Sequence, residues 1–339
     1  MPRYTGPLPA YCRADGVIDR RVGVDGKEYG IGFALALPEK WNRDFLMQGG
    51  GGFNGSVQPP VGAQAAGDTP GLTRGFAVVS TDTGHEAAYV FDGSFMADQK
   101  AYLDYAYVAI VRVSELAKRM IASYYGQPAE HSYYVGCSTG GREGMLMTQR
   151  YPLYFDGVVS GDPAMRTGFS TLADRWAAAS FNRIAPKGAD GKPQPAFSED
   201  DKKLILGALL KQCDAQDGVQ DGLIFSQKGC NFDPAVLACS PAKKDSCLRP
   251  EQVAALQRAF AGPKDSMGNQ VYPGFPYDTG ITTKAGFPGL LDSRPGMIPA
   301  STDTQPDVDK EAAAAGNPLV DTMYTNLSSF SGHGGKLLF

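Results

Sequence analysis

Short apolar runs, each bounded by turn residues, recur along residues 28–164 and predict buried β-strands. These runs are EYGIGFALAL, RDFLMQ, GFAVVST, HSYYVG and FDGVVSG. Between them, residues 100–124 carry apolar side chains at helical spacing, and the segment GGREGMLMTQRYP predicts a helix that ends at a proline. Because strands that alternate with helices favour a mostly parallel sheet, this part of the chain is predicted to form an α/β domain.

The pattern changes after Ala164. Residues 165–325 contain no strong strand signal, many prolines and glycines, and four of the six cysteines. We therefore expect an inserted, irregular domain there. The terminal segment GGKLLF again predicts a core strand. The expected organisation is an α/β core in 1–164, the inserted domain in 165–325 and a return to the core in 326–339.

The composition is that of an ordinary globular protein, with 42% apolar and 20% charged residues among 339. A net charge of −4 gives no general attraction to nucleic acid or to anionic membranes. No apolar stretch is long enough for a transmembrane helix, and the first residues, MPRYTGPLPAYCRADG, lack the apolar core of a signal peptide. We therefore expect neither nucleic acid nor a membrane as a partner.

The segment GCSTG, residues 136–140, matches the pattern G-x-S-x-G and carries the clearest chemical signal. It follows a predicted strand and precedes a predicted helix, which is the setting of a nucleophile elbow with Ser138 as the nucleophile. The backbone N–H of Thr139 is expected to bind an oxyanion, and a second donor is expected from Gly52 in the glycine-rich loop QGGGGFNG. The alternative is a glycine-rich packing turn with an incidental serine.

A nucleophilic serine needs a base, usually a histidine oriented by an acid, in the chain order serine, acid, histidine. His85 and His131 precede the serine, and His333 lies just before the final predicted strand, where we expect an exposed loop residue. We therefore predict no catalytic acid or base in this chain. Arg142 and Glu143, at the start of the helix after the serine, are predicted to be structural.

Four cysteines, Cys213, Cys230, Cys239 and Cys247, lie within 35 residues of one another. This spacing in a loop-rich region favours local disulfides, which form in oxidising compartments. Because no export signal is visible, we expect the chain to be a piece of a longer, secreted or periplasmic precursor.

Several segments together resemble the tannase and feruloyl esterase family, which includes the mono(2-hydroxyethyl) terephthalate hydrolases. They are LPAYCRADGVID, FLMQGGGGFNG, VVSTDTGH, YYVGCSTGGREGMLMTQRYPLYFDGVVSGDPA, CDAQDGVQDGLI and GGKLLF. The resemblance implies an α/β-hydrolase core with an inserted lid domain. It also implies a carboxylic ester hydrolase that acts on esters of aromatic acids through an acyl-enzyme on Ser138. Hydrolysis of a terephthalate monoester is the alternative. A truncated, inactive relative that only binds a ligand or calcium is the alternative of another class.

The resemblance also implies a pattern of disulfides. Cys213 would pair with Cys230 and Cys239 with Cys247, which leaves Cys12 and Cys137 unpaired here. In the family, the cysteine before the serine is bridged to a cysteine beside the catalytic histidine, which follows GGKLLF together with the catalytic aspartate. This chain stops at Phe339, so we expect it to be truncated at both ends. The alternative is a bridge between Cys12 and Cys137.

The loop DAQDGVQDGLIF after Cys213 carries three aspartates, Asp214, Asp217 and Asp221, interleaved with glycines. Closely spaced carboxylates and carbonyls suit a hard cation. The resemblance implies a structural calcium ion held by these aspartates and by the carbonyls of Val219 and Leu223. The alternative is a solvated acidic turn.

The substrate is indicated only by the resemblance. The stretch NQVYPGFPYDTGI, residues 269–281, corresponds to a lid segment that contacts the substrate ring in the family. The terephthalate hydrolases carry an arginine and several tryptophans shortly after it. Here the following residues contain no tryptophan, and Arg294 is the only arginine. The side chain of Thr139 would also line the acyl pocket, and the expected acyl group is aromatic.

Overall fold

The computed structural model describes residues 6–63, 69–191, 194–241, 245–282, 291 and 303–339. Contacts divide the chain into two compact units, which we describe separately. Unit one comprises the chain up to Arg166 together with Asn317–Phe339. Unit two comprises Thr167–Gly316. Arg294 and most of its neighbours, on which the comparison with terephthalate hydrolases depends, lie outside the described residues.

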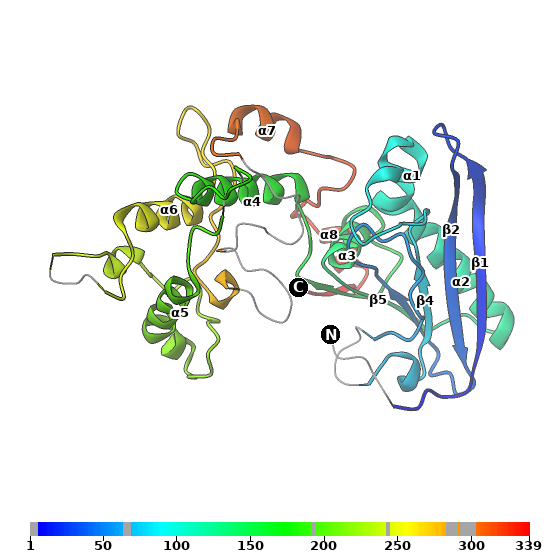
Figure 1. The fold of residues 1–339 in the computed structure, drawn as a ribbon. Helices are drawn as coiled ribbons and strands as arrows, with labels where there is room; N and C mark the ends of the chain where they lie inside the picture. Colours follow the sequence, from blue (N-terminus) through cyan, green and yellow to red (C-terminus); the bar gives the residue numbers. More distant parts are fainter. Residues whose placement is uncertain (1–5, 64–68, 192–193, 242–244, 283–290, 292–302) are drawn as a thin grey trace. The chain divides into compact units, whose positions relative to one another are not determined.

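A single mixed sheet of seven strands runs through the described part of unit one, in the order β1-β2-β4-β3-β5-β6-β7 (Figure 1). The neighbours from β4 to β7 are parallel, whereas β1–β2 and β2–β4 are antiparallel. The strands are β1 (Tyr11–Val22), β2 (Glu28–Pro38), β3 (Asp44–Gln48), β4 (Ala77–Thr81), β5 (His131–Cys137), β6 (Gly157–Gly161) and β7 (Lys336–Leu338).

The strands expected from the apolar runs are all present, and β1 is the strand that the pattern did not predict. It pairs with β2 over most of its length, from Tyr11 opposite Pro38 to Val22 opposite Glu28. Its side chains are exposed or only partly buried along the whole strand. An edge strand with both faces near solvent leaves no alternation of apolar and polar residues, so it carries no hydrophobic signal.

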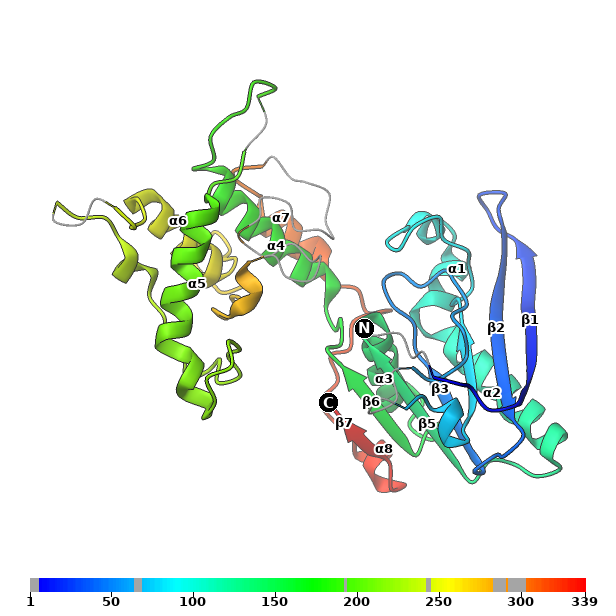
Figure 2. The same cartoon turned by 60° about the horizontal axis from the view of Figure 1, so that its bottom comes forward.

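Two helices cover one face of the sheet. Helix α2 (Ala109–Tyr125) packs on β2 and β4, and α3 (Thr139–Arg150) packs on β5 and β6. Figure 2 shows both helices behind the strands. Between helices and sheet lies the main core, which includes Leu35, Phe45, Met47, Val79, Val113, Ile121, Tyr134, Leu146 and Phe155. The expected order of strands and helices therefore gives the predicted α/β core.

The helix expected over 100–124 is interrupted. It consists of α1 (Gln99–Leu103), a π-helical turn over Asp104–Val108 and then α2. A single wider turn changes the hydrogen-bonding register without removing the apolar periodicity, so the sequence pattern shows one continuous helix. Short helices also occur at η1 (Leu72–Arg74), η2 (Ser94–Ala97) and α8 (Ser328–Gly332).

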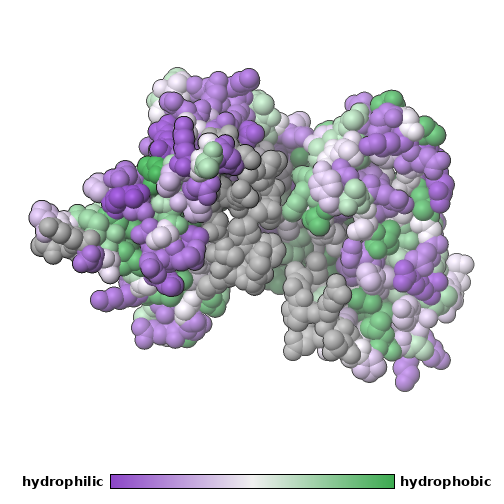
Figure 3. All heavy atoms as spheres, in the orientation of Figure 1, coloured by the Kyte–Doolittle hydropathy of each residue, from purple (hydrophilic) through white to green (hydrophobic). Residues whose placement is uncertain are grey.

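Unit two is helical, whereas an irregular domain was expected. Its α-helices are α4 (Thr167–Asn182), α5 (Glu199–Cys213), α6 (Pro250–Ala261) and α7 (Val308–Ala315), with 3₁₀ turns at η4 (Asp214–Asp217), η5 (Pro234–Leu237) and η6 (Thr279–Ile281). The apolar faces of α4, α5 and α6 meet in a separate core that includes Phe181, Phe197, Ile205, Leu256 and Phe260. On the face drawn in Figure 3, hydrophilic residues predominate around α7.

The expected disulfide pairs are confirmed. Cys213 is bonded to Cys230 and Cys239 to Cys247, with Cα–Cα distances of 5.4 and 4.9 Å. Cys12 and Cys137 are free thiols, so the alternative bridge between them is absent. None of the helices in the described ranges combines the length and the apolar character needed to cross a bilayer.

The return to unit one begins at Asn317, earlier than the expected residue 326. Backbone contacts account for this position. The guanidinium of Arg150 donates to the carbonyls of Pro318 and Leu319, and the N–H of Thr322 donates to the carbonyl of Met165. These bonds attach a segment without regular structure to α3 and to the exit from β6, which hydrophobic patterning does not reveal.

Candidate active site

Ser138 lies at the turn between β5 and α3, in a backbone conformation that side chains rarely adopt. Its φ is 59° and its ψ is −120°, which stores local strain. Its N–H donates to the carbonyl of Gly161 at 3.0 Å, and its carbonyl accepts from Ala164 at 3.1 Å. The turn expected from the G-x-S-x-G pattern is therefore present, and it is held in place by the exit from β6.

The two glycines of the pattern are required by close approaches of the backbone. A Cβ at Gly136 would lie 2.5 Å from the carbonyl of Gly140, and a Cβ at Gly140 would lie 2.6 Å from the carbonyl oxygen of Gly50. Real Cβ atoms do not approach other atoms so closely. The strand, the helix and the glycine-rich loop therefore meet at a point where no side chain fits.

Thr139, the first residue of α3, contributes two polar groups to this point. Because the first N–H groups of a helix have no partner within it, the N–H of Thr139 remains available, and the helix dipole favours negative charge beside it. The Thr139 hydroxyl donates to the carbonyl of Gly52. This second bond fixes the peptide of Gly52 and is not evident from the sequence.

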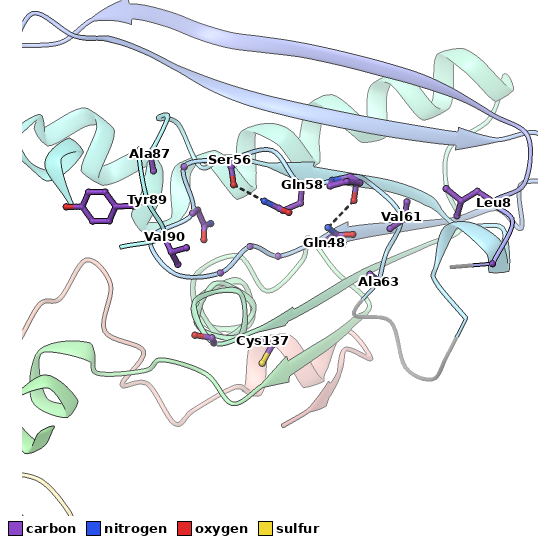
Figure 4. Close-up of a pocket in the computed structure, with 18 residues that line it drawn as sticks. Leu8, Gln48, Ser56, Gln58, Val61, Ala63, Ala87, Tyr89, Val90 and Cys137 are labelled. Carbon is purple, nitrogen blue, oxygen red and sulfur yellow. Dashed lines mark hydrogen bonds between the residues drawn. The ribbon is translucent and has the colours of Figure 1, made fainter. Parts of the chain in front are cut away.

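A pocket of about 1060 Å³ opens in front of Ser138 within unit one (Figure 4). Its wall includes Gly49, Gly50 and Gly51 of the glycine-rich loop, whereas Gly52 is packed on the carbonyl of Val90. The remaining lining residues are Gly6, Leu8, Gln48, Asn54, Gly55, Ser56, Gln58, Pro59, Val61, Ala63, Ala87, Tyr89, Val90 and Cys137. The structure thus brings the predicted nucleophile and the predicted oxyanion loop to one cavity.

The ends of the pocket differ in character. Tyr89 and Val90 remain more than half exposed and present apolar surface to it. At the other end, the amide of Gln48 is already engaged, since it accepts from the N–H of Gly62 at 2.7 Å and donates to the carbonyl of Pro59. Most of the lining that a ligand could contact is therefore apolar, with backbone N–H groups near Ser138.

None of the three histidines is among the residues that line this pocket. His131 begins β5, whereas Ser138 follows its end, so the two are separated by about 20 Å of strand. His333 precedes β7, whose Lys336 is opposite Gly157 at the start of β6, so it lies at the same far edge of the sheet. It is exposed, as expected.

His85 follows β4, at the edge of the sheet where Ser138 lies, but it is buried. Only 2% of its surface is exposed, and its ring stacks on Phe95 with centroids 3.7 Å apart. Burial lowers the pKa of His85 to about 4, although the backbone of Phe53 and of Thr83 favours the protonated ring. A neutral imidazole packed in this way supports the loop after β4, and it is not among the residues that line the pocket of Ser138.

This burial predicts how stability depends on pH. The unfolded chain binds a proton at His85 near pH 6.5 and the folded chain only near 4, so the free energy of unfolding is expected to fall as the pH drops from about 6.5 to about 4. His85→Phe should remove this part of the pH dependence, measured as the difference between urea midpoints at pH 7 and pH 4.5.

Asp82 provides the matched control, because burial raises its pKa whereas burial lowers the pKa of His85. Burial raises its pKa to about 7, so the folded chain holds a proton that the unfolded chain releases near pH 3.8, and this stabilisation is lost as the pH rises through 7. Asp82→Asn should therefore change the pH slope in the direction opposite to His85→Phe. Equal slopes in all three proteins would contradict the burial of both groups.

The aspartates of the predicted calcium loop lie in and after η4. Asp214 accepts from the N–H groups of Asp221 and Gly222, and Asp217 accepts from those of Val219 and Phe225. Asp221 accepts from the N–H of Leu223. Among the described residues, no three His, Cys, Asp or Glu side chains are grouped so that they could hold a metal ion. Carboxylate and carbonyl oxygens are suitable ligands for calcium. In this structure, however, each of the three carboxylates accepts hydrogen bonds from backbone N–H groups, so the calcium site stays a prediction.

The sequence reasoning missed the side chains that join the glycine-rich loop to α3. Glu143, assigned a structural role without a partner, lies between Asn54 of the loop and Tyr134 of β5. No local signal identifies this contact, because Asn54 and Glu143 are 89 residues apart.

The sheet order, the strained serine between β5 and α3, and the glycine-rich loop beside it define an α/β-hydrolase fold, with Ser138 at the turn where this fold places its nucleophile. Residues 12–300 match the family model described as tannase and feruloyl esterase, and the chain belongs to this family. The resemblance inferred from the motifs is thus confirmed over most of the chain.

Three relatives illustrate this membership. A mono(2-hydroxyethyl) terephthalate hydrolase of Piscinibacter sakaiensis is 37% identical and covers 82% of this chain and 50% of its own length. A protein of Aspergillus flavus described as probable feruloyl esterase B-2 is 30% identical, covering 89% and 57%. The crystal structure of feruloyl esterase B from Aspergillus oryzae superposes with a TM-score of 0.72 at 27% identity, covering 96% of this chain and 64% of that one. The chain spans about half the length of the curated relatives it matches.

Proposed function

We propose that this protein is a serine ester hydrolase that cleaves carboxylic esters of aromatic acids through an acyl-enzyme on Ser138. The observation that carries the proposal is the strained serine at the β5–α3 turn, which lines the same pocket as the glycine-rich loop. Ser138 would attack the ester carbonyl. The N–H of Thr139 and an N–H of the glycine-rich loop, expected from Gly52, would stabilise the oxyanion.

The pocket supports an aromatic substrate. Its volume of about 1060 Å³ is at the upper end of what small-molecule sites usually provide, and its exposed apolar wall includes an aromatic ring, that of Tyr89. A flat aromatic group could pack on this ring while the ester carbonyl lies at Ser138. Family membership and the names of the relatives support the same substrate class.

The proposal is tested with a panel of esters. Methyl ferulate, methyl gallate and a terephthalate monoester are each incubated with the protein, and methyl acetate serves as the aliphatic control. We expect kcat/KM to be highest for an aromatic ester. Preference for the aliphatic ester would refute the aromatic acyl group.

Hydrolysis of a terephthalate monoester is the second candidate, and the bacterial relative with that printed name favours it. The scarcity of tryptophan argues against it, since Trp41 lies in unit one and Trp176 is held by a hydrogen bond from its indole N–H to the carbonyl of Arg258. In the ester panel, the highest kcat/KM on the terephthalate monoester would favour this candidate over a feruloyl esterase or tannase activity.

A protein that binds ligands without hydrolysing them is the candidate of another class. The observation behind it is that no histidine in the described ranges lines the pocket of Ser138. Saturable binding of ferulate, measured by fluorescence quenching, together with no turnover of any ester by the complete protein, would favour this candidate.

A secreted or periplasmic location is part of the proposal. The two disulfides support it, because such bonds persist in oxidising compartments. A fusion to a reporter that is active only after export would test the location.

The calcium site is likewise proposed, with Asp214, Asp217, Asp221 and the carbonyls of Val219 and Leu223 as ligands. If it binds calcium, the ion should tie the loop to the disulfide at Cys213, and EGTA should lower the melting temperature of unit two by several degrees. Asp217→Asn should reduce that response. Asp233→Asn, which changes a carboxylate of unit two outside this loop, is the matched control. An unchanged melting curve in EGTA would exclude a structural calcium ion.

A further inference from the structure

The second turn of α3 carries a buried carboxyl group that the proposed chemistry does not use. Glu143 is 1% exposed. Its Oε1 accepts from the side-chain amide of Asn54, and its Oε2 accepts from the hydroxyl of Tyr134 at 2.8 Å and from the N–H of Gly50 at 3.4 Å. The carboxyl group therefore receives hydrogen bonds from the strand before Ser138 and from both ends of the glycine-rich loop.

The partners of Glu143 are themselves fixed. Tyr134 is fully buried on β5, and its single hydroxyl proton is shared between the Oε2 of Glu143 and the carbonyl of Gly140, each 2.8 Å away. Asn54 is buried and has a φ of 58°, so its backbone is held in a turn. Strand β5, helix α3 and the glycine-rich loop thus meet at the side chain of Glu143. The relative positions of these three elements set the distance between Ser138 and the oxyanion donors.

A buried carboxyl group lowers the stability of a protein unless its hydrogen bonds compensate for the hydration that it loses. Burial raises the pKa of Glu143, while the neighbouring guanidinium of Arg142 acts in the opposite direction. An apolar side chain of similar volume would fill the space without this penalty. An apolar side chain could not accept the hydrogen bonds from Gly50 and Asn54, and so it would not hold these two residues at a set distance from α3.

We propose that Glu143 is a positioning residue, which with Tyr134 holds the glycine-rich loop at the distance from Ser138 that oxyanion binding requires. This inference rests on the proposed function. It assigns Glu143 a role through the loop and no contact with the substrate. Because the oxyanion exists only after attack on the carbonyl, loss of this hydrogen-bonded link lowers kcat and leaves KM nearly unchanged.

The kinetic test uses Glu143→Ala, Tyr134→Phe and the double variant, each in the complete protein. We expect kcat to fall about 10- to 100-fold in Glu143→Ala, with KM changed by less than about twofold. Tyr134→Phe removes only a hydroxyl and keeps the packed ring, so it answers the question even if Glu143→Ala folds poorly. In the double variant, the loss should be smaller than the product of the single losses, because both act through one link.

Thr148→Ala is the matched control. Thr148 lies on α3 and is buried, and its hydroxyl donates to the carbonyl of Met145 on the same helix and not to the glycine-rich loop. A purely structural role for Glu143 predicts that both alanine variants lower the melting temperature and leave kcat per folded molecule unchanged. Unchanged kcat in Glu143→Ala and Tyr134→Phe would overturn the proposal.

A second measurement does not depend on activity. Hydrogen exchange, followed by mass spectrometry, should be about tenfold faster in residues 48–55 of Glu143→Ala than of the wild type, with exchange in 131–137 unchanged. If no ester is hydrolysed but residues 48–55 respond in this way, the proposed function fails and the link between α3 and the loop stands. If these residues exchange as in the wild type, the link is refuted whatever the activity.

Discussion

Ser138→Ala is expected to lower kcat for aromatic esters by at least about 10⁴-fold, because it removes the atom that attacks the carbonyl. The pocket and the N–H groups around it remain, so binding of the product acid should change little. Turnover is measured with the complete protein, and the acyl-enzyme is sought by mass spectrometry after rapid acid quenching.

Ser132→Ala is the control for this experiment. Ser132 is a buried serine near the start of β5, at the end of the strand opposite to Ser138, and its N–H donates to Asp156. Its replacement should leave kcat unchanged. Turnover by Ser138→Ala at a rate near that of the wild type would mean that the strained turn serves packing and that another residue is the nucleophile.

Arg142→Ala is expected to lower the free energy of unfolding of unit one by about 3 to 5 kcal/mol. Arg142 is only 1% exposed, and its guanidinium lies over the ring of Tyr105, with its central carbon 4.7 Å from the ring centroid. It donates to the carbonyl of Ala106 at 3.1 Å, in the π-helical turn. Its removal leaves a large cavity, buried carbonyls without donors and a carboxyl group, that of Glu143, without its neighbouring positive charge.

Arg150→Ala provides the comparison. Arg150 also lies on α3, and its guanidinium lies over the ring of Tyr107. Because Arg150 is partly exposed, water can replace the hydrogen bonds that its guanidinium donates. We expect it to cost about 1 kcal/mol. Urea unfolding, followed by circular dichroism, measures both variants. Equal losses would show that burial of Arg142 contributes nothing beyond its hydrogen bonds.

The centre of unit one is predictable from the sequence because its strands are buried on both faces. Continuous apolar runs such as those of β2 and β4 are typical of strands that are covered by protein on both sides. The same holds for the turn at Ser138, since glycines at 136 and 140 are required by the close approach of three elements. Here local sequence and tertiary structure demand the same residues.

The parts that escape prediction depend on contacts between distant segments. Strand β1 forms because β2 offers it hydrogen bonds, and its own side chains stay near solvent. The helices of unit two cover a core that becomes visible only once they are packed, and loops rich in glycine and proline between them mask their periodicity. The link through Glu143 joins residues whose proximity is created by the fold.

The division of unit one into two stretches of sequence has a consequence for how the chain is synthesised. Strand β7 pairs with β6, yet all of Thr167–Gly316 leaves the ribosome between them. Until β7 arrives, the outer edge of β6 is an unpaired template for other strands. The disulfides of unit two span only 17 and 8 residues, so the contacts around them are local in sequence, which favours early folding. The nascent protein is therefore most prone to misassociation after unit two has folded and before β7 has paired with β6, and slower translation between β6 and β7 lengthens that interval.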